Sequence, residues 1–478
     1  MCGIAGFCNF KEDFEENTDY WNFRLEKMRA VLAHRGNDAR GRYLKKHIGL
    51  SHSRLAIRDI LCGDQPMTRT HNGYEYTICY NGEIYNTDEL IPELSENGFV
   101  CSTTSDTEVI LYAYIHWGAD FVNRLNGIFA FAIWDTAKSR LLLYRDRVGV
   151  KPLFYAIRGD SLVFGSEPKA CFAHPAVKPE LDKQGLQELL AIGPAHTSGL
   201  SLFKDLFEVL PGHFMIYSRD GLHDETYWEL TSREHTESYR DTVAHTRFLV
   251  EDAIKRQMVS DVPVCTFLSG GIDSSIVTAI AANYMNTRGK TLNTFSFDFK
   301  DNDRYFKANA FQPERDLPYV NRMLEEYETA HSYLECDENS LFKALFAAVD
   351  AKDMPGMTDV DSSLLYFCSL VSRKNKVALT GECADEIFGG YPWFYRKELL
   401  ERYGFPWSSD VAPRLALLRD DVGLELNLSG YQAFRYEESR SKAPLLYGEA
   451  GEDESRRIIG YLNIKWFMQT LLDRMDRT

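Results

Sequence analysis

The sequence predicts a layered α+β domain followed by an α/β domain with a parallel sheet. Three observations support this prediction. The chain has 478 residues, which is too long for one hydrophobic core. Its first half is rich in short segments of alternating polarity that are separated by turn signals. Further along, short apolar strands alternate with longer helical stretches, as in proteins with parallel sheets.

The strands and helices of the first domain can be placed by their periodicity. "YTICYNGEIYN" (76–86) predicts strand, Asn-Gly turn and strand, whereas "GIFAFAIWD" and "RLLLYRD" predict a hairpin and "LVFGSE" a further strand. Helical spacing occurs in "WNFRLEKMRAVLAH" and "TEVILYAYIHWG". A closing hairpin is expected in 208–230, so we expect the first domain to span 1–228.

The polar segment "TSREHTESYRDT" (231–242) has no strand periodicity and is expected to contain the linker. The second domain is then expected to span 236–478, with strands in "VPVCTFL", "TLNTFSFDF" and "KVALT". The helix-like pattern of "LNIKWFMQTLLDRMDRT" ends without a stop signal, which suggests that this domain is incomplete at its C-terminus.

The composition excludes several classes of protein. A net charge of −16 argues against a nucleic-acid partner, and no apolar run approaches the length of a membrane span. The ten cysteines contain no C-x-x-C pair, which suits a reducing compartment rather than a disulfide framework or a zinc site. We therefore expect a cytoplasmic enzyme that acts on small molecules, and a homodimer is compatible with the sequence.

The second domain contains a candidate phosphate-binding loop. "VPVCTFLSGGIDSSIVTAIAA" predicts a strand, the loop Ser269–Ser275 and an apolar helix. Glycines let the backbone approach an anion closely, while serine hydroxyls and a helix N-terminus donate to phosphate oxygens. Asp273 could hold a Mg²⁺ ion that bridges phosphates. A plain strand-to-helix turn would explain the glycines alone, but not the whole string.

A second loop, "TGECADEIFGGY", follows another predicted strand and carries Glu382 and Asp385. Ligands usually bind at the carboxyl ends of strands in open α/β sheets, so both loops are expected to face one site. The alternative is a solvated acidic turn. The phosphate-binding loop in the same sheet makes a ligand site the better interpretation.

Cys2 directly follows the initiator methionine in "MCGIAGF". If Met1 is removed, the α-amino group of Cys2 can accept the thiol proton, as in N-terminal nucleophiles. Alone, Cys2 would be interpreted as a structural thiol. Residues in three polar turns favour a catalytic role instead. Arg54 could bind an α-carboxylate, and Asp106 or Glu83 could bind an α-ammonium group. Asn81 and Gly82 could donate to an oxyanion.

Taken in order, "MCGIAGF", "HRG", "LSHSRLAI", "YNGEIYN", "SDTEVIL", "NGIFAFAIWD", "RDRVGVKPLFY" and "FGSEPKA" resemble the class II glutamine amidotransferases. With "LSGGIDSS" and "GECADEIFGGYPWF", nearly the whole chain resembles the glutamine-hydrolysing asparagine synthetases. The resemblance implies an N-terminal-nucleophile αββα sandwich followed by an adenine-nucleotide-hydrolase-like α/β domain. It also implies that glutamine hydrolysis at Cys2 supplies ammonia to β-aspartyl-AMP made from aspartate and ATP.

The resemblance also implies roles for individual residues. The glutamine-binding positions are Arg54, Leu55, Ala56, Ile57, Arg58, Asn81, Gly82, Glu83 and Asp106. The ATP-binding positions are Leu268, Ser269, Gly270, Gly271, Asp273, Ser274, Ser275, Phe297, Thr380 and Gly381. Asp273 and Asp385 are the expected Mg²⁺ ligands, and Glu382 matches a position implicated in forming the acyl-adenylate.

Two motifs depart from the family pattern. H-R-G-P-D is "HRGND" here, and T-x-x-R-A-S is "TDVDSS". The loss of a cation and the gain of two carboxylates leave open a different acceptor carboxylate. A non-catalytic homologue and a chain that only hydrolyses glutamine are further alternatives. Amidotransferases acting on sugar phosphates or phosphoribosyl substrates do not adenylate their acceptor, so "LSGGIDSS" argues against them.

Overall fold

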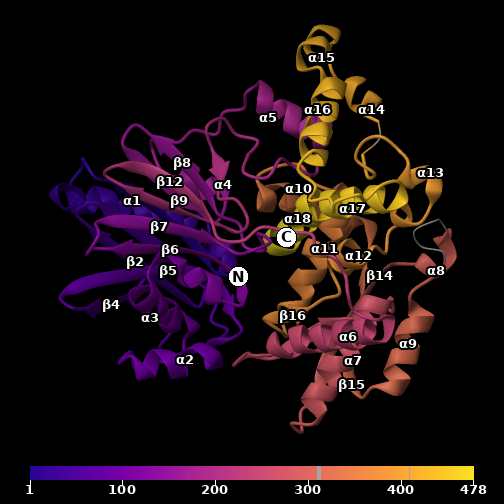
Figure 1. Ribbon diagram of the computed structural model, residues 1–478, viewed down its shortest axis with the longest axis horizontal. Coiled ribbons are helices and arrows are strands. Elements are labelled where there is room, and N and C mark those ends of the chain that lie inside the picture. The colour runs from indigo at the N-terminus through magenta and orange to yellow at the C-terminus, as the bar shows by residue number, and fades with distance from the viewer. Residues whose placement is uncertain (309–313, 409) are drawn as a thin grey trace. The chain divides into compact units, whose positions relative to one another are not determined.

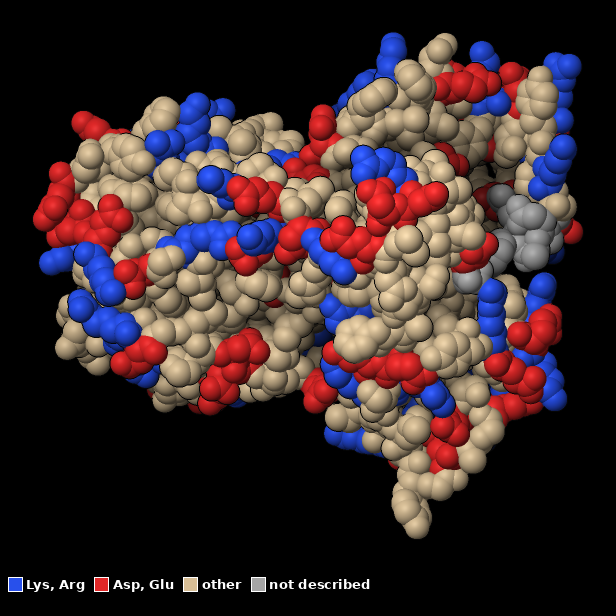
Figure 2. All heavy atoms as spheres, turned by 90° about the horizontal axis from the view of Figure 1, so that it is seen from above, with Lys and Arg blue, Asp and Glu red and all other residues tan. Residues whose placement is uncertain are grey.

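A computed structural model describes residues 1–308, 314–408 and 410–478 (Figure 1). The chain forms two compact units. Unit 1 contains Met1–Ser232 together with Tyr391–Arg477, and unit 2 contains Arg233–Gly390. On the face shown in Figure 2, basic and acidic side chains are interspersed.

Unit 1 contains two six-stranded antiparallel sheets. The first has the order β10-β8-β9-β1-β3-β2, and the second β12-β11-β7-β6-β5-β4. The strands of the first sheet are β1 (Gly3–Asn9), β2 (Ala39–Lys45), β3 (Ile48–Arg54), β8 (Phe154–Arg158), β9 (Ser161–Gly165) and β10 (Phe207–Glu208). Those of the second are β4 (Met67–His71), β5 (Tyr74–Ile84), β6 (Gly127–Asp135), β7 (Arg140–Arg145), β11 (His213–Ser218) and β12 (Gly221–Thr226).

The two sheets pack face to face, with helices on both outer faces. Ile4 and Leu50 of the first sheet share a buried cluster with Ala132 and Leu143 of the second. The outer face of the first sheet packs against α1 (Thr18–Ala30) and α4 (Pro168–Phe172). The outer face of the second packs against α2 (Thr87–Glu96) and α3 (Asp106–Trp117). The predicted αββα sandwich is thus confirmed.

The segment 391–477 completes unit 1. It contains α13 (Lys397–Leu400), α14 (Ala412–Leu415), α15 (Asp420–Leu426), α16 (Leu428–Arg440), α17 (Glu452–Leu462) and α18 (Met468–Arg477). Apolar side chains of α14, α15, α16 and α17 share a cluster with Ala191 and Ile192, which follow α5 (Lys183–Gln187). Near this cluster, the buried Glu188 carboxylate accepts a hydrogen bond from Tyr431 and lies 3.6 Å from Arg435. These contacts attach α16 to the N-terminal part of the chain.

Unit 2 is an α/β fold around a four-stranded parallel sheet with the order β15-β14-β13-β16. The strands are β13 (Val264–Phe267), β14 (Leu292–Phe299), β15 (Thr329–Cys336) and β16 (Val377–Leu379). The helices are α6 (Tyr239–Arg256), α7 (Ile272–Asn286), α8 (Asn302–Tyr305), α9 (Leu317–Glu326), α10 (Glu338–Lys352), α11 (Thr358–Val371) and α12 (Ala384–Phe388). The predicted parallel sheet is confirmed, since each of its three predicted strands is present.

One local prediction was wrong. Asn81 and Gly82 do not form a turn, because β5 runs through both as one eleven-residue strand paired with β6. A Cβ atom at Gly82 would lie 2.2 Å from the carbonyl oxygen of Ile128, so glycine allows this close pairing. The boundary between the two units, after Ser232, falls inside the segment predicted to contain the linker, and Ser238 then caps α6, which starts at Tyr239.

Candidate active sites

Cys2 lies immediately before β1, and its thiol faces the loop after β3. The backbone N–H of Leu55 donates to Cys2 Sγ at 3.4 Å, and Sγ lies 3.6 Å from the carbonyl oxygen of Leu55. Burial raises the pKa of the thiol, while the N-terminal ammonium group, the Leu55 contact and Arg35 act in the opposite direction. Because burial favours the protonated thiol, Cys2 needs a nearby base to become a nucleophile.

The side chain of Asn81 is suited to stabilise an oxyanion. Asn81 lies toward the C-terminal end of β5 and is 1% exposed, yet its Nδ2 group has no hydrogen-bond partner among the described residues. Buried polar groups in proteins are nearly always paired, so an unpaired donor needs an explanation. An amide that becomes bonded only when charge develops on a substrate oxygen provides one.

Glu83, which interacts electrostatically with Cys2, neighbours a second carboxylate, the buried Asp106. In the described part of the chain, Glu83 Oε2 is buried without a hydrogen-bond partner. Burial raises the pKa of Glu83 well above its ordinary value, and the negative charges of Asp106 and Cys2 raise it further. Asp106 accepts hydrogen bonds from Tyr80 and from the N–H of Ile84 at 2.9 and 3.0 Å. An ammonium group would relieve the repulsion between these carboxylates and would satisfy Glu83.

The predicted glutamine-binding loop 54–58 is tightly held. Asp38 accepts a hydrogen bond from the N–H of Ala56 at 2.8 Å, and Arg58 donates to the carbonyl oxygen of Ile84 at 2.8 Å. Arg54 donates to the carbonyl oxygens of residues 58, 59 and 60. The predicted binding of an α-carboxylate by Arg54 therefore requires some of its donors to change partner.

In unit 2, the loop between β13 and α7 is held by its own hydroxyl groups. Ser269 Oγ and Ser274 Oγ lie 3.0 Å apart, and Ser274 donates to the carbonyl oxygen of Gly271 at 3.1 Å. Gly271 is the N-cap of α7 and makes no side-chain cap, so no side chain occupies the helix N-terminus. This arrangement leaves backbone N–H groups available for an anion.

The second loop, after β16, lies against the first. A Cβ atom at Gly381 would be 2.7 Å from the N atom of Ser274, so only glycine permits this approach. Burial raises the pKa of Asp273, and the negative charge of Asp385 raises it further. Burial also raises the pKa of Asp385. Two mutually repelling carboxylates suit a divalent cation, although no group of three or more metal-ligating side chains occurs among the described residues.

The remaining predicted ATP-binding positions surround these two loops. Leu268 directly follows β13 and its N–H donates to the carbonyl oxygen of Phe295 at 2.8 Å. Phe297 lies on β14 with its ring 5.2 Å from that of Phe367. Thr380 accepts a hydrogen bond from the N–H of Glu382 at 3.3 Å. Positions from three neighbouring parallel strands thus converge on one edge of the sheet.

The departure at "TDVDSS" lies at the start of α11. Asp361 is 2% exposed and its carboxylate accepts a hydrogen bond from the N–H of Met357 at 2.9 Å. It also pairs with the buried Lys352 at 3.4 Å. One of the two additional carboxylates is therefore neutralised within the fold, whereas Asp359 is exposed.

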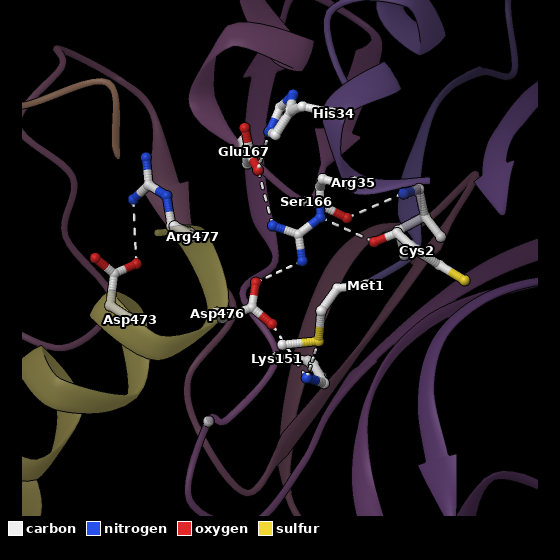
Figure 3. Close-up of polar contacts among 12 residues, drawn as sticks. Met1, Cys2, His34, Arg35, Lys151, Ser166, Glu167, Asp473, Asp476 and Arg477 are labelled. Atoms are coloured by element: carbon white, nitrogen blue, oxygen red, sulfur yellow. Dashed lines mark hydrogen bonds and ion pairs between the residues drawn. The ribbon is translucent and has the colours of Figure 1, made fainter. Parts of the chain in front are cut away.

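Sequence reasoning assigned no role to a buried ionic cluster behind Cys2 (Figure 3). Arg35 donates from Nε to the carbonyl oxygen of Cys2 at 2.9 Å and from Nη1 to Glu167 at 2.7 Å. Its Nη2 donates to Asp476 of α18, which also pairs with Lys151 at 3.1 Å. Arg35, Lys151 and Glu167 occur in motifs that signalled the resemblance, but nothing in the sequence pointed to Asp476.

Both parts of the chain match known protein families. Residues 1–228 match the glutamine amidotransferase domain family and residues 245–478 match the asparagine synthase family. Over all 478 residues, the chain is 48% identical to asparagine synthetase [glutamine-hydrolyzing] 3 of Bacillus subtilis and covers 77% of it. The chain belongs to the asparagine synthetase family.

More distant relatives include a further asparagine synthetase and an amidase. A putative asparagine synthetase of Methanocaldococcus jannaschii is 32% identical, with 82% of this chain and 76% of the relative covered. Amidase chyE of Penicillium rubens is also 32% identical, with 86% of this chain and 62% of the relative covered. Among the described residues, this family member has no helix that is both long and apolar enough to cross a membrane.

Proposed function

We propose that this protein is a glutamine-dependent asparagine synthetase. In unit 1, Cys2 attacks the side-chain amide carbon of glutamine, releases ammonia and forms a thioester that water hydrolyses to glutamate. The observation that carries this proposal is the unpaired Asn81 Nδ2 in the same strand as the unpaired carboxylate oxygen of Glu83. Both polar groups lack partners that a glutamine molecule could supply.

Each residue of unit 1 then has a defined task. After removal of Met1, the α-amine of Cys2 accepts the thiol proton and returns it to the departing ammonia. The Asn81 amide and the Gly82 N–H donate to the oxyanion. Glu83 and Asp106 bind the α-ammonium group, whereas Arg54 and the loop 55–58 bind the rest of the amino acid.

In unit 2, ATP is expected to bind over the loop 269–275, with Leu268, Phe297, Thr380 and Gly381 around the nucleotide. The serine hydroxyls and the N-terminus of α7 would hold the pyrophosphate, and Asp273 with Asp385 would hold Mg²⁺. ATP supplies the adenylyl group that activates the β-carboxylate of aspartate. Ammonia then displaces AMP and gives asparagine. A cytoplasmic location and a homodimer remain predictions.

A second candidate function is amidation of a different carboxylate by the same chemistry. The departure at "TDVDSS", in which Asp361 pairs with Lys352, and the name of the amidase relative favour considering it. Pyrophosphate release should be measured with ATP, Mg²⁺, glutamine and a panel of carboxylates. Stimulation by aspartate supports asparagine synthesis, whereas stimulation only by another carboxylate supports the second candidate.

The nucleophile is tested by Cys2→Ala. We expect this variant to lose glutamine-dependent synthesis and to retain synthesis from ammonium salts, because unit 2 receives ammonia from either source. Full activity with glutamine would contradict the assignment of Cys2. Mass spectrometry of the wild-type N-terminus tests the removal of Met1.

A further inference from the structure

The buried cluster behind Cys2 links the nucleophile to a helix from a distant part of the sequence. Arg35 follows α1 and is 4% exposed. Its three nitrogen atoms bind three different partners: the Cys2 carbonyl oxygen, Glu167 and Asp476 (Figure 3). The planar guanidinium group has a fixed geometry, so the positions of the two carboxylates determine where its Nε points.

The cluster is buried, and its Glu167 carboxylate also pairs with Lys169 and His34, each at 3.0 Å. The side chains of Arg35, Lys151, Glu167 and Asp476 are all 3% exposed or less. Arg35 pairs with both carboxylates, and Lys151 pairs with Asp476. Ion pairs of this kind depend strongly on both partners, because removal of one leaves the other buried without compensation. A loss of Asp476 would therefore release Arg35 rather than leave it in place.

The Cys2 carbonyl carbon is bonded to the Cα atom, which carries the Cβ–Sγ side chain. A shift of this carbonyl therefore moves Sγ relative to the Leu55 N–H and to Asn81. The thiol therefore depends on the cluster through the backbone of its own residue.

We propose that Asp476 is a positioning residue for glutamine hydrolysis, because it holds the Arg35 guanidinium that fixes the Cys2 carbonyl and hence the thiol. The amidotransferase match ends at residue 228, so a helix from the asparagine synthase match completes the support of the nucleophile. This inference rests on the proposed glutaminase function. It adds a residue that touches neither glutamine nor the thiol.

The test compares Asp476→Asn with Arg35→Lys in the full chain. Both changes retain polar side chains of similar size, and Arg35→Lys also retains the charge. We expect kcat for glutamine hydrolysis to fall about 10- to 100-fold, since a misplacement of about 1 Å can have such an effect. The KM for glutamine and ammonia-dependent synthesis should stay unchanged.

Three further measurements separate positioning from general stability. Glu188→Gln removes another buried carboxylate that attaches the segment 391–477, but it does not contact Arg35 and should retain kcat. The rate at which iodoacetamide alkylates the N-terminal peptide should fall in Asp476→Asn. In the double variant Arg35→Lys/Asp476→Asn, the loss should not exceed that of the more severe single variant, because both changes break one chain of contacts.

The outcomes are distinct. Wild-type kcat in Asp476→Asn, an equal loss in Glu188→Gln, or additive losses in the double variant would each overturn the role of Asp476. Glutamine hydrolysis that survives in Cys2→Ala would instead overturn the proposed function itself. A selective kcat loss with slower alkylation and intact ammonia-dependent synthesis supports the inference.

Discussion

The unpaired amide of Asn81 allows a prediction in which activity and stability respond differently. In the resting protein, Asn81 Nδ2 is buried without a partner. An unpaired buried polar group disfavours folding by about 1–3 kcal/mol. Asn81→Ala removes this penalty but also removes a small amount of packing, so the two effects on the free energy of unfolding offset each other. We expect the midpoint of thermal unfolding to change by only a few degrees.

The effect on catalysis should be large. If the amide donates to the oxyanion, its removal lowers kcat for glutamine hydrolysis about 10²- to 10³-fold, equivalent to about 2.7–4 kcal/mol. Ammonia-dependent synthesis should be unaffected. Glutamate release measured at several glutamine concentrations separates kcat from KM, and pyrophosphate release with ammonium salts measures unit 2.

Asn86 provides a matched control. It is also buried, but its amide donates to the carbonyl oxygen of Arg124 at 2.9 Å and accepts from the N–H of Asn126 at 2.8 Å. Asn86→Ala should therefore destabilise the fold and leave kcat of the folded protein near the wild-type value. The reasoning is refuted if Asn81→Ala keeps its kcat within threefold of wild type, or if it loses as much stability as Asn86→Ala.

Two further predictions concern the substrate sites. Burial and Asp106 raise the pKa of Glu83, so its contribution to stability is lost as pH rises from about 4.5 through the raised value. Glu83→Gln should make thermal stability depend less on pH over this range. It should also raise the KM for glutamine about 10- to 100-fold through loss of a charge-assisted hydrogen bond; an unchanged KM would exclude Glu83 from ammonium binding. Gly381→Ala should abolish ATP-dependent pyrophosphate release but not glutamine hydrolysis, because the new Cβ forces the two loops apart. Gly423→Ala in α15, where the nearest atom would be 3.6 Å away, is its control, and equal losses in both would contradict the role of the loop contact.

Local patterns predicted much of the fold. Hairpins such as β6–β7 and the strands around the loop 269–275 follow from alternation and apolar runs within a few residues. The Asn-Gly pair at 81–82 led to the wrong prediction of a turn, because its turn preference is a local property. Pairing with β6 instead extends the strand through both residues. Tertiary contacts overrode the local preference there.

The candidate site was predictable to the extent that motifs mark it. Cys2, Asn81 and Asp273 stand out as residue types with a defined chemistry in recognisable strings. Asp476 does not, because its importance arises from a contact with Arg35 across 441 residues of sequence. The attachment of the segment 391–477 to unit 1 also arises from contacts between distant parts of the sequence, since hydrophobic periodicity does not indicate which domain a helix packs against.

The separation between Arg35 and Asp476 also sets an order of events during synthesis. Ribosomes add about 5–20 residues per second, so the 441 residues between them take about 20–90 s to make. During that interval the sandwich can form, but Arg35 lacks one of its two carboxylates and Ala191 and Ile192 lack their apolar cover. A nascent chain would thus carry Cys2 before the support of that cysteine is complete. Full glutaminase activity would be reached only after α18 has left the ribosome, by which time all of Arg233–Gly390 in unit 2 has also been made.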